Sequence, residues 1–491
     1  MSIVLEAPPA AVTEYAKAPL ALLIDGQWRE GSSGRTRDVL DPTTGEVLAA
    51  VPTADRSDVD AAIAAAARAF PRWRDLPVDE RTRILMKAAA IMRERADAIA
   101  RIATIEEGKT FAEMRGEVLR CAKALEWDAQ DAKRAYGRII PIDNDTELTV
   151  RHEPVGPVGA LVPWNFPVGS PNRKIAGAIS AGCSLVLKAS DETPATAVAL
   201  VACYQDAGLP DGVLNLVFGH SAEIAEQFVR DERIRLIAFT GSIPNGKDLA
   251  AKAGAEMKPM ILELGGHAPV IVCEDADPKL AARRTAAAKY ANAGQVCTSP
   301  SRILVHRSIY REFLDELVKA SAEVKVGFGL DEGVTMGPLA NERRLVAMER
   351  LVADAVARGA RVEIGGKRIG TRGYFFEPTV LSDVPLDADI MREEPFGPVA
   401  PVVAFDDLEE ALAIANALPY GLAAYGFTEK AATADRLIRG LEAGILSINH
   451  CGGSVPEAPS GGVKQSGIGR EGGQEGLEAY LVVKRVSHKL R

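Results

Sequence analysis

The chain has 491 residues, of which 47% are hydrophobic and 25% are charged, and its formal net charge is −9. This length leaves room for about two or three domains with sizeable cores. The acidic balance excludes the basic footprint of a nucleic-acid-binding protein, and no apolar run approaches the roughly 18 residues that a membrane span needs.

The N-terminal segment and the cysteines predict a cytoplasmic protein. No basic cluster precedes the short apolar start, which Glu6 interrupts, so we interpret residues 1–20 as a flexible extension and not as a signal peptide. The six cysteines are scattered and include no C-x-x-C pair. This pattern argues against a disulfide framework and against structural zinc, and we predict no metal site.

The first 154 residues predict small β elements on either side of a helical segment. An Asp-Gly pair inside residues 22–28 predicts a hairpin. Residues 57–70 have the pattern of an amphipathic helix with Ser57 as its N-cap. The polar alternation of residues 137–154 predicts a second hairpin.

From about residue 150 onward, strands alternate with helices. Near-continuous apolar runs, typical of strands buried on both faces of a parallel sheet, occupy residues 158–163, 183–188, 213–218 and 234–239. The alanine-rich segment between the second and third runs predicts a helix that stops near Gly208. This alternation predicts a doubly wound α/β domain.

A second α/β region is expected to begin near Pro259. Helical patterns at 308–324 and 407–421 continue it, and residues 479–488 predict a final strand. This strand and the hairpin at 137–154 lie outside the two α/β cores, which makes them candidates for subunit contacts.

A glycine-bearing turn after a predicted strand is the first candidate for chemistry. Gly241 to Lys247 reads G-x-x-x-x-G-K, but Asp248 follows where a P-loop needs a hydroxyl for Mg²⁺. We therefore reject a nucleoside triphosphatase. A turn of this kind still suits a dinucleotide pyrophosphate at a helix start, although many such turns carry glycine for geometry alone.

Two further stretches each allow two interpretations. In "PWNFP", Asn165 is either an oxyanion donor or part of a rigid aromatic loop with Trp164 in the core. In "LELGGHAP", Glu263 is either a base with a raised pKa or a salt-bridge partner, and His267 is interpreted as a loop residue.

Cys297 in "NAGQVC" is either a small buried hydrophobe or a nucleophile. No histidine lies nearby, so activation would require a helix start or a cationic or amide-rich pocket. The carboxylates of "EEPFGPV", from Glu393 to Val399, would by themselves indicate a solvated turn.

Taken together and in this order, these motifs resemble those of the aldehyde dehydrogenase superfamily, from "DGQW" to "YLVVKRV". The matching elements are "PWNFP", "VLKASDETP", "FTGS", "ELGG", "NAGQVC", "EEPFGPV" and "GGVKQSGIGRE". The resemblance implies a Rossmann-like cofactor domain (21–136 and 155–258), an α/β catalytic domain (259–472) and a small β oligomerisation segment (137–154 and 473–491). It also implies a homodimer or homotetramer.

The resemblance further implies oxidation of an aldehyde to a carboxylic acid with NAD or NADP. Cys297 would attack as thiolate, Asn165 and the Cys297 N–H would hold the oxyanion, and Glu263 would activate the water that hydrolyses the thioester. The implied cofactor-binding residues are Trp164, Lys188, Asp191, Gly219, Phe239, Gly241, Ser242, Leu264, Glu394 and Phe396. In "KASD", Asp191 keeps a carboxylate that favours NAD, and NADP remains the alternative.

Within the superfamily the chain looks most like the succinate-semialdehyde dehydrogenase branch. By that resemblance Arg173 and Ser454 would bind the substrate carboxylate, but Ala291 stands where the branch has a second arginine, and Ser460 replaces an aromatic residue. Succinate semialdehyde and another small aliphatic or aromatic aldehyde therefore both remain candidates. The base Glu263 argues against a coenzyme-A-acylating enzyme, and the complete set of reacting groups argues against a catalytically silent protein on the same fold.

Overall fold

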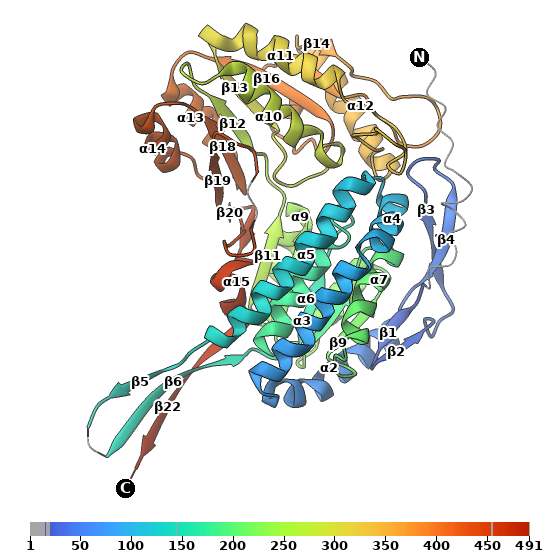
Figure 1. Cartoon of the computed structure of the whole chain (residues 1–491), viewed down its shortest axis with the longest axis vertical. Helices are drawn as coiled ribbons and strands as arrows, with labels where there is room; N and C mark the ends of the chain where they lie inside the picture. Colours follow the sequence, from blue (N-terminus) through green and yellow to red (C-terminus); the bar gives the residue numbers. More distant parts are fainter. Residues whose placement is uncertain (1–14, 16–19, 144, 453–454, 491) are drawn as a thin grey trace.

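The computed structural model describes residues 15, 20–143, 145–452 and 455–490. Two twisted sheets, each flanked by helices, and one projecting three-stranded ribbon make up most of the chain (Figure 1). Figure 1 shows the ribbon extending away from the two sheets. None of the helices in these ranges is long and apolar enough to cross a membrane.

The first sheet has eight strands in the order β2-β1-β9-β8-β7-β10-β11-β21. Its members are β1 (Leu22–Ile24), β2 (Gln27–Arg29), β7 (Val158–Leu161), β8 (Leu185–Lys188), β9 (Leu214–Val217), β10 (Leu236–Gly241), β11 (Met260–Leu264) and β21 (Gly467–Ile468). The five strands from β9 to β11 run parallel. Strands β7, β8 and β9 are buried at every position, as their apolar runs predict.

Helices of the first unit pack against this sheet and against one another. They are α2 (Arg56–Asp75), α3 (Val78–Glu94), α4 (Ala96–Glu107), α5 (Phe111–Asp131), α6 (Gly169–Ala181), α7 (Pro194–Asp206), α8 (Ser221–Arg230), α9 (Ile243–Ala255) and the short α15 (Gly473–Glu478). Helix α5 packs against α3, α4 and α6. The loop that enters α6 therefore lies against the start of α5.

The second sheet has seven strands in the order β14-β15-β16-β13-β12-β18-β19. Its strands are β12 (Pro269–Val272), β13 (Arg302–His306), β14 (Arg361–Ile364), β15 (Thr379–Ser382), β16 (Val399–Phe405), β18 (Ala423–Phe427) and β19 (Ile445–Ile448). Its helices are α10 (Pro278–Tyr290), α11 (Tyr310–Ala322), α12 (Glu342–Ala357), α13 (Leu408–Asn416) and α14 (Ala431–Gly440). The predicted α/β fold with two main parallel sheets is confirmed.

Smaller β elements complete the chain. The projecting ribbon consists of β5 (Arg138–Pro141), β6 (Thr146–Pro154) and β22 (Leu481–Lys489). Two-stranded pairs are formed by β3 (Thr36–Leu40) with β4 (Val47–Pro52), and by β17 (Tyr420–Gly421) with β20 (Val463–Lys464). The predicted hairpin of β1 and β2 and the antiparallel pairing of β5 with β6 are confirmed.

Three local expectations were wrong. Strand β11 pairs with β10, so it belongs to the first sheet and does not begin the second. Helix α2 is capped by Asp55, whose carboxylate accepts from the backbone N–H groups of Ser57 and Asp58. Tyr15, assigned to a flexible extension, is buried, and its hydroxyl donates to a carboxylate oxygen of buried Glu106 at 2.7 Å.

Candidate active site

A run of left-handed residues sets the position of Cys297. After α10 ends at Tyr290, Asn292, Ala293 and Gly294 have φ angles of 49°, 50° and 74°. A Cβ on Gly294 would lie 2.1 Å from the Gly397 carbonyl oxygen, so only glycine fits this approach. The alanine at a left-handed position costs about 1–3 kcal/mol, a strain that is common at functional sites. Cys297 follows in a turn and is half-buried.

Asn165 lies against this turn from the other unit. It follows β7, is buried, and its side-chain Nδ2 donates to the Gln295 main-chain oxygen at 3.1 Å. Its own main-chain oxygen accepts from Asn292 Nδ2 at 3.0 Å and from Lys109 Nζ at 3.1 Å. The side-chain amide has two N–H groups, so one N–H remains for a ligand after the bond to Gln295.

Glu263 occupies a strand position between two neighbours. It pairs with Thr240 of β10 on one side and with Gly467 of β21 on the other. Its Oε1 is buried and has no hydrogen-bond partner among the described residues. Gly461 leaves space there, since a Cβ on it would lie 2.9 Å from that oxygen. A buried acceptor without a partner is costly unless a ligand or water meets it.

Burial and charge tune the acidity of Glu263. Burial, followed by the Glu471 carboxylate, raises the pKa of Glu263 to about 8, against the lowering effect of Lys174 and Arg173. Lys174 and Glu471 form a buried ion pair. Sequence reasoning missed both residues, although a lysine in the apolar part of α6 is the kind of signal that could have identified one of them.

The environment of Cys297 opposes ionisation of its thiol. Burial raises the pKa of Cys297 to about 12, the carboxylates of Glu394 and Glu263 add to this, and the Arg173 guanidinium acts in the opposite direction. Neither a helix start nor a histidine activates the thiol among the described residues. Arg173, in α6, is the cation whose charge reaches both Cys297 and Glu263.

The remaining substrate-side predictions fall at the edge of this region. Arg173 is half-buried, and a Cβ on Gly472 would lie 3.1 Å from its guanidinium nitrogen. Ser454 lies outside the described residues. Ala291 is half-buried beside the left-handed run, and Ser460 exchanges two backbone hydrogen bonds with Glu471, at 2.7 and 2.8 Å.

The carboxyl ends of β8 and β9 carry a cluster of charges around Asp191. One carboxylate oxygen of Asp191 accepts from the Gly219 N–H at 3.0 Å and lies 3.1 Å from Lys188 Nζ. The other oxygen pairs with the guanidinium of Arg37, on β3, at 3.1 Å. Lys188 and Asp191 are buried, whereas Arg37 is half-exposed. Sequence reasoning missed Arg37, which lies 154 positions from Asp191.

The turn after β10 has the backbone groups that a dinucleotide pyrophosphate needs. Ser242 is the N-cap of α9 and makes no side-chain capping bond to the described residues. The first N–H groups of the helix are therefore open to an anion. Gly241 packs on the Phe239 ring, where a Cβ would lie 2.4 Å from the nearest ring atom. Gly246 makes similar room for Leu264. These residues fit NAD(P).

The other predicted cofactor residues meet beside the Cys297 turn. Trp164 is half-buried, and its ring lies edge-on to Phe396 with the centroids 5.7 Å apart, so it is not a core residue. A Glu394 carboxylate oxygen accepts weakly from the Gly266 N–H at 3.4 Å. Gly265 allows this approach, because a Cβ would lie 2.4 Å from the other Glu394 oxygen.

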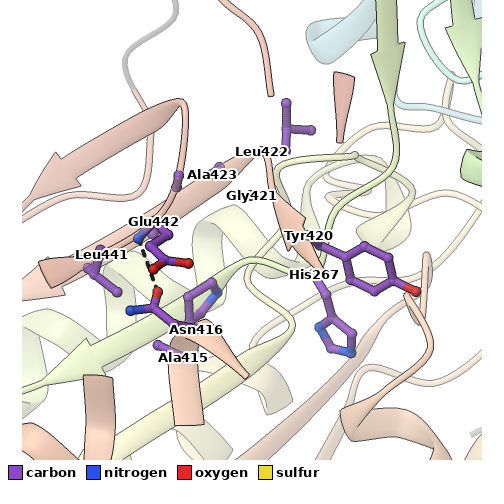
Figure 2. A pocket seen from close by; sticks show the side chains of 12 residues that line it. His267, Ala415, Asn416, Tyr420, Gly421, Leu422, Ala423, Leu441 and Glu442 are labelled. Atoms are coloured by element: carbon purple, nitrogen blue, oxygen red, sulfur yellow. Dashed lines mark hydrogen bonds between the residues drawn. The ribbon is translucent and has the colours of Figure 1, made fainter. Parts of the chain in front are cut away.

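A separate small cavity lies behind the Gly265-Gly266 turn, between β12, β17 and the end of α13. Figure 2 shows His267 and Tyr420 at its lining, with the Glu442 N–H donating to the Asn416 side-chain oxygen at 3.0 Å. Its volume of about 10 Å³ holds at most about one water molecule. None of the predicted catalytic residues lines it. His267 lies in the loop between β11 and β12, as expected, and there it is buried and bonded to Ser301 and to the Ile390 oxygen.

Comparison with known proteins agrees with this geometry. The model of the aldehyde dehydrogenase family matches residues 28–486. The chain belongs to the aldehyde dehydrogenase family. It is thus an NAD(P)-dependent aldehyde dehydrogenase, and the resemblance stated from its motifs is confirmed.

Among its curated relatives is a putative 4-(hydroxymethyl)benzenesulfonate dehydrogenase of Comamonas testosteroni, 45% identical over 94% of this chain and 97% of that protein. The NADP⁺-linked succinate-semialdehyde dehydrogenase of Escherichia coli is 41% identical over 94% and 96%. The solved betaine aldehyde dehydrogenase of Staphylococcus aureus, in complex with NAD⁺, superposes with a TM-score of 0.95 at 35% identity, over 98% of this chain and 97% of that one.

The charges around the thiol of this aldehyde dehydrogenase predict the effect of removing one carboxylate. Because the Glu394 carboxylate raises the pKa of Cys297, Glu394→Gln should lower that pKa and speed alkylation at about pH 8 roughly three- to tenfold. The measurement is the rate of iodoacetamide labelling at Cys297, read by mass spectrometry of the peptide. Glu393→Gln, at an exposed neighbour paired with Arg350, is the control. Slower labelling of Glu394→Gln would contradict the electrostatic account.

Proposed function

We propose that this enzyme oxidises an aldehyde that carries an anionic group at its far end. The single observation that carries the proposal is the position of Arg173, half-buried and close enough for its charge to act on both Cys297 and Glu263. A guanidinium suits both carboxylate and sulfonate oxygens, because its N–H groups form a planar fork.

The names of the relatives support an anionic substrate. They include dehydrogenases of succinate semialdehyde, glutarate semialdehyde, 4-(hydroxymethyl)benzenesulfonate and 3-sulfolactaldehyde. Succinate semialdehyde is our first candidate. The second is an aromatic or other small aldehyde, because Ala291 and Ser460 leave more room than an arginine and an aromatic ring would.

In the proposed mechanism, Cys297 Sγ attacks the carbonyl carbon as thiolate. The unused N–H of Asn165 and the Cys297 backbone N–H stabilise the oxyanion. NAD(P), when bound in this cleft, would supply the hydride acceptor. Glu263 then removes a proton from water, which hydrolyses the thioester and releases the acid. The buried pair of Lys174 and Glu471 acts on Glu263 through its charges, Glu471 raising the pKa of the base and Lys174 lowering it.

We further propose which residues hold the cofactor. The pyrophosphate would meet Ser242 and the open N–H groups of α9, and Glu394 would bond the nicotinamide ribose beside Phe396 and Trp164. Lys188 and Asp191 would meet the adenosine ribose. Asp191 favours NAD, but its charge is balanced by Lys188 and Arg37, which weakens the repulsion of a 2′-phosphate.

We propose that the ribbon of β5, β6 and β22 joins subunits into a homodimer or homotetramer. It carries exposed apolar side chains, among them Ile139 and Val483, with about two-thirds of each side chain accessible. Such exposure is uncommon unless a partner covers it. A cytoplasmic location is also proposed, on the free state of the six cysteines.

Removing the proposed anion-binding cation should change the choice of substrate. Arg173→Leu is expected to lower kcat/KM for succinate semialdehyde about 10- to 100-fold more than for butanal, because one charge-assisted contact is lost. The assay follows NADH or NADPH formation across succinate semialdehyde, 4-sulfobenzaldehyde and their uncharged counterparts butanal and benzaldehyde, with Cys297→Ala as the blank. The ratio removes the part of the effect of Arg173 on the thiol that both classes of aldehyde share. An equal loss of kcat/KM for charged and uncharged aldehydes would contradict the proposal of an anionic substrate.

Removing the proposed base should separate acylation from deacylation. In Glu263→Gln the first turnover of NADH formation persists, while the steady-state rate falls about 100-fold or more. With a pKa of about 8, Glu263 acts as a base only when deprotonated, so the hydrolytic rate should rise as pH passes through about 8. The variant should lose this rise. Glu256→Gln, at an exposed site, is the control. A Glu263→Gln enzyme that keeps a fast steady-state rate and the same pH dependence would refute the role of Glu263 as the base.

The charge cluster at Asp191 should govern the choice of cofactor. Asp191→Ser removes the carboxylate and frees Lys188 and Arg37 for a 2′-phosphate, so the ratio of kcat/KM with NADP to that with NAD should rise about tenfold or more. Adding Arg37→Gln should reverse part of this rise. An unchanged ratio in Asp191→Ser would show that this cluster does not contact the ribose.

A further inference from the structure

Lys109 is a buried cation that lies against the loop that carries Asn165. It lies in the short connection between α4 and α5, and only 3% of its side chain is exposed. Its Nζ donates to Glu117 Oε2 at 2.7 Å and to the Asn165 main-chain oxygen at 3.1 Å. It also stands 4.1 Å from the centroid of the Phe166 ring. One ammonium group thus contacts two consecutive residues of the "PWNFP" loop.

The partner carboxylate holds the far end of the same loop. Glu117 Oε1 accepts from the backbone N–H groups of Val168 and Gly169, at 3.0 and 2.8 Å, where α6 begins. Lys109 and Glu117 therefore fix the loop at Asn165 and again at the start of the helix that carries Arg173. A carboxylate at a helix start is favourable, because the N–H groups there lack partners within the helix.

The Cys297 loop is joined to the same assembly. Asn292 donates its Nδ2 to the Asn165 main-chain oxygen at 3.0 Å, and its backbone N–H donates to Glu113 Oε1 at 2.8 Å. The Asn165 oxygen thus accepts from Lys109 and Asn292 together, while its side chain donates to the Gln295 oxygen at 3.1 Å. Asn165 is constrained at both its main chain and its side chain.

We propose that Lys109 is a positioning residue that holds Asn165 in the orientation needed to bind the oxyanion. This inference rests on the oxyanion role proposed above for Asn165. Two donors on one carbonyl oxygen hold the peptide plane after Asn165, which limits the directions that its Cα–Cβ bond can take. Burying an ion pair costs several kcal/mol for each ion before their attraction is counted. An apolar pair would pack at lower cost, but it would not donate to Asn165.

The experiment removes the donor together with the charge of its ion-pair partner Glu117. In the double variant Lys109→Met with Glu117→Gln, the glutamine oxygen can still accept from Val168 and Gly169. We expect the single-turnover rate of NADH formation, with enzyme in excess over succinate semialdehyde or benzaldehyde, to fall about 10- to 100-fold, because small displacements of a reacting group carry penalties of this size. The dissociation constant for NAD, read by fluorescence, should stay within about twofold, because neither residue belongs to the proposed cofactor cleft.

A cycle with Asn165→Ala separates positioning from general damage to the fold. If Lys109 acts through the Asn165 side chain, the two substitutions should lower the single-turnover rate when Asn165 is present. They should have almost no further effect on that rate when Asn165 is replaced by alanine. Lys109→Arg, which keeps a donor of the same charge, should recover part of the rate. Thr82→Val, which removes a buried hydrogen bond from α3 to the Ala129 oxygen of α5, should lower thermal stability and leave the rate unchanged.

Two results would overturn the inference: an unchanged single-turnover rate in the double variant, or an equal loss with and without the Asn165 side chain. A different result, in which Asn165→Ala alone leaves the rate unchanged, would instead remove the oxyanion role on which the inference rests.

Discussion

The hydrogen bond from Asn165 Nδ2 to the Gln295 main-chain oxygen is the contact on which the site depends. Asn165 follows a strand of the first sheet, and Gln295 precedes Cys297 in a loop of the second unit. The bond is buried, so neither loop can shift without leaving a polar group unpaired, which costs about 1–3 kcal/mol. The two α/β units are thereby joined at the point where the proposed chemistry takes place.

The same assembly explains why the Cys297 loop tolerates an unfavourable backbone. Asn292 and Ala293 adopt left-handed conformations, which asparagine tolerates but the Cβ of Ala293 disfavours. Asn292 compensates with its side-chain bond to the Asn165 oxygen and its backbone bond to Glu113. Gly294 then allows the main chain to pass directly against Gly397. The strain and the hydrogen bonds occur in the same three residues. The geometry of the loop therefore depends on the first unit and not only on its own sheet.

The sequence was sufficient to predict the fold class, because β7, β8 and β9 are apolar on both faces and leave no alternative to a covered parallel sheet. It was not sufficient to assign β11 to the correct sheet. The apolar pattern of that strand suits either sheet, and its place is decided by pairing with β10. The prediction of the N-cap of α2 was wrong for a similar reason. Aspartate and serine are both good N-cap residues, and only the backbone geometry decides between Asp55 and Ser57.

The residues of the candidate site also fall into two groups, those that the sequence identifies and those that it does not. Cys297, Glu263 and Asn165 were identified by short motifs whose residues are neighbours in sequence. Arg37 and Lys109 lie in no such motif. Each acts through a partner far along the chain, as Arg37 does with Asp191 at a separation of 154 residues. Contacts of this kind depend on how the elements pack, and the hydrophobic period of one segment carries no information about them.

The position of Arg173 links substrate choice to reactivity. Its charge lowers the pKa of Cys297, whereas burial and two carboxylates raise it. A substrate anion bound to Arg173, as proposed, would neutralise the nearby cation that favours the thiolate. The positive charge of an oxidised nicotinamide would then be the remaining influence in that direction. An anionic aldehyde would thus gain affinity from Arg173 and lose some thiolate at the same time. An uncharged aldehyde would bind more weakly to a more reactive thiol, so the two classes should differ more in KM than in kcat/KM.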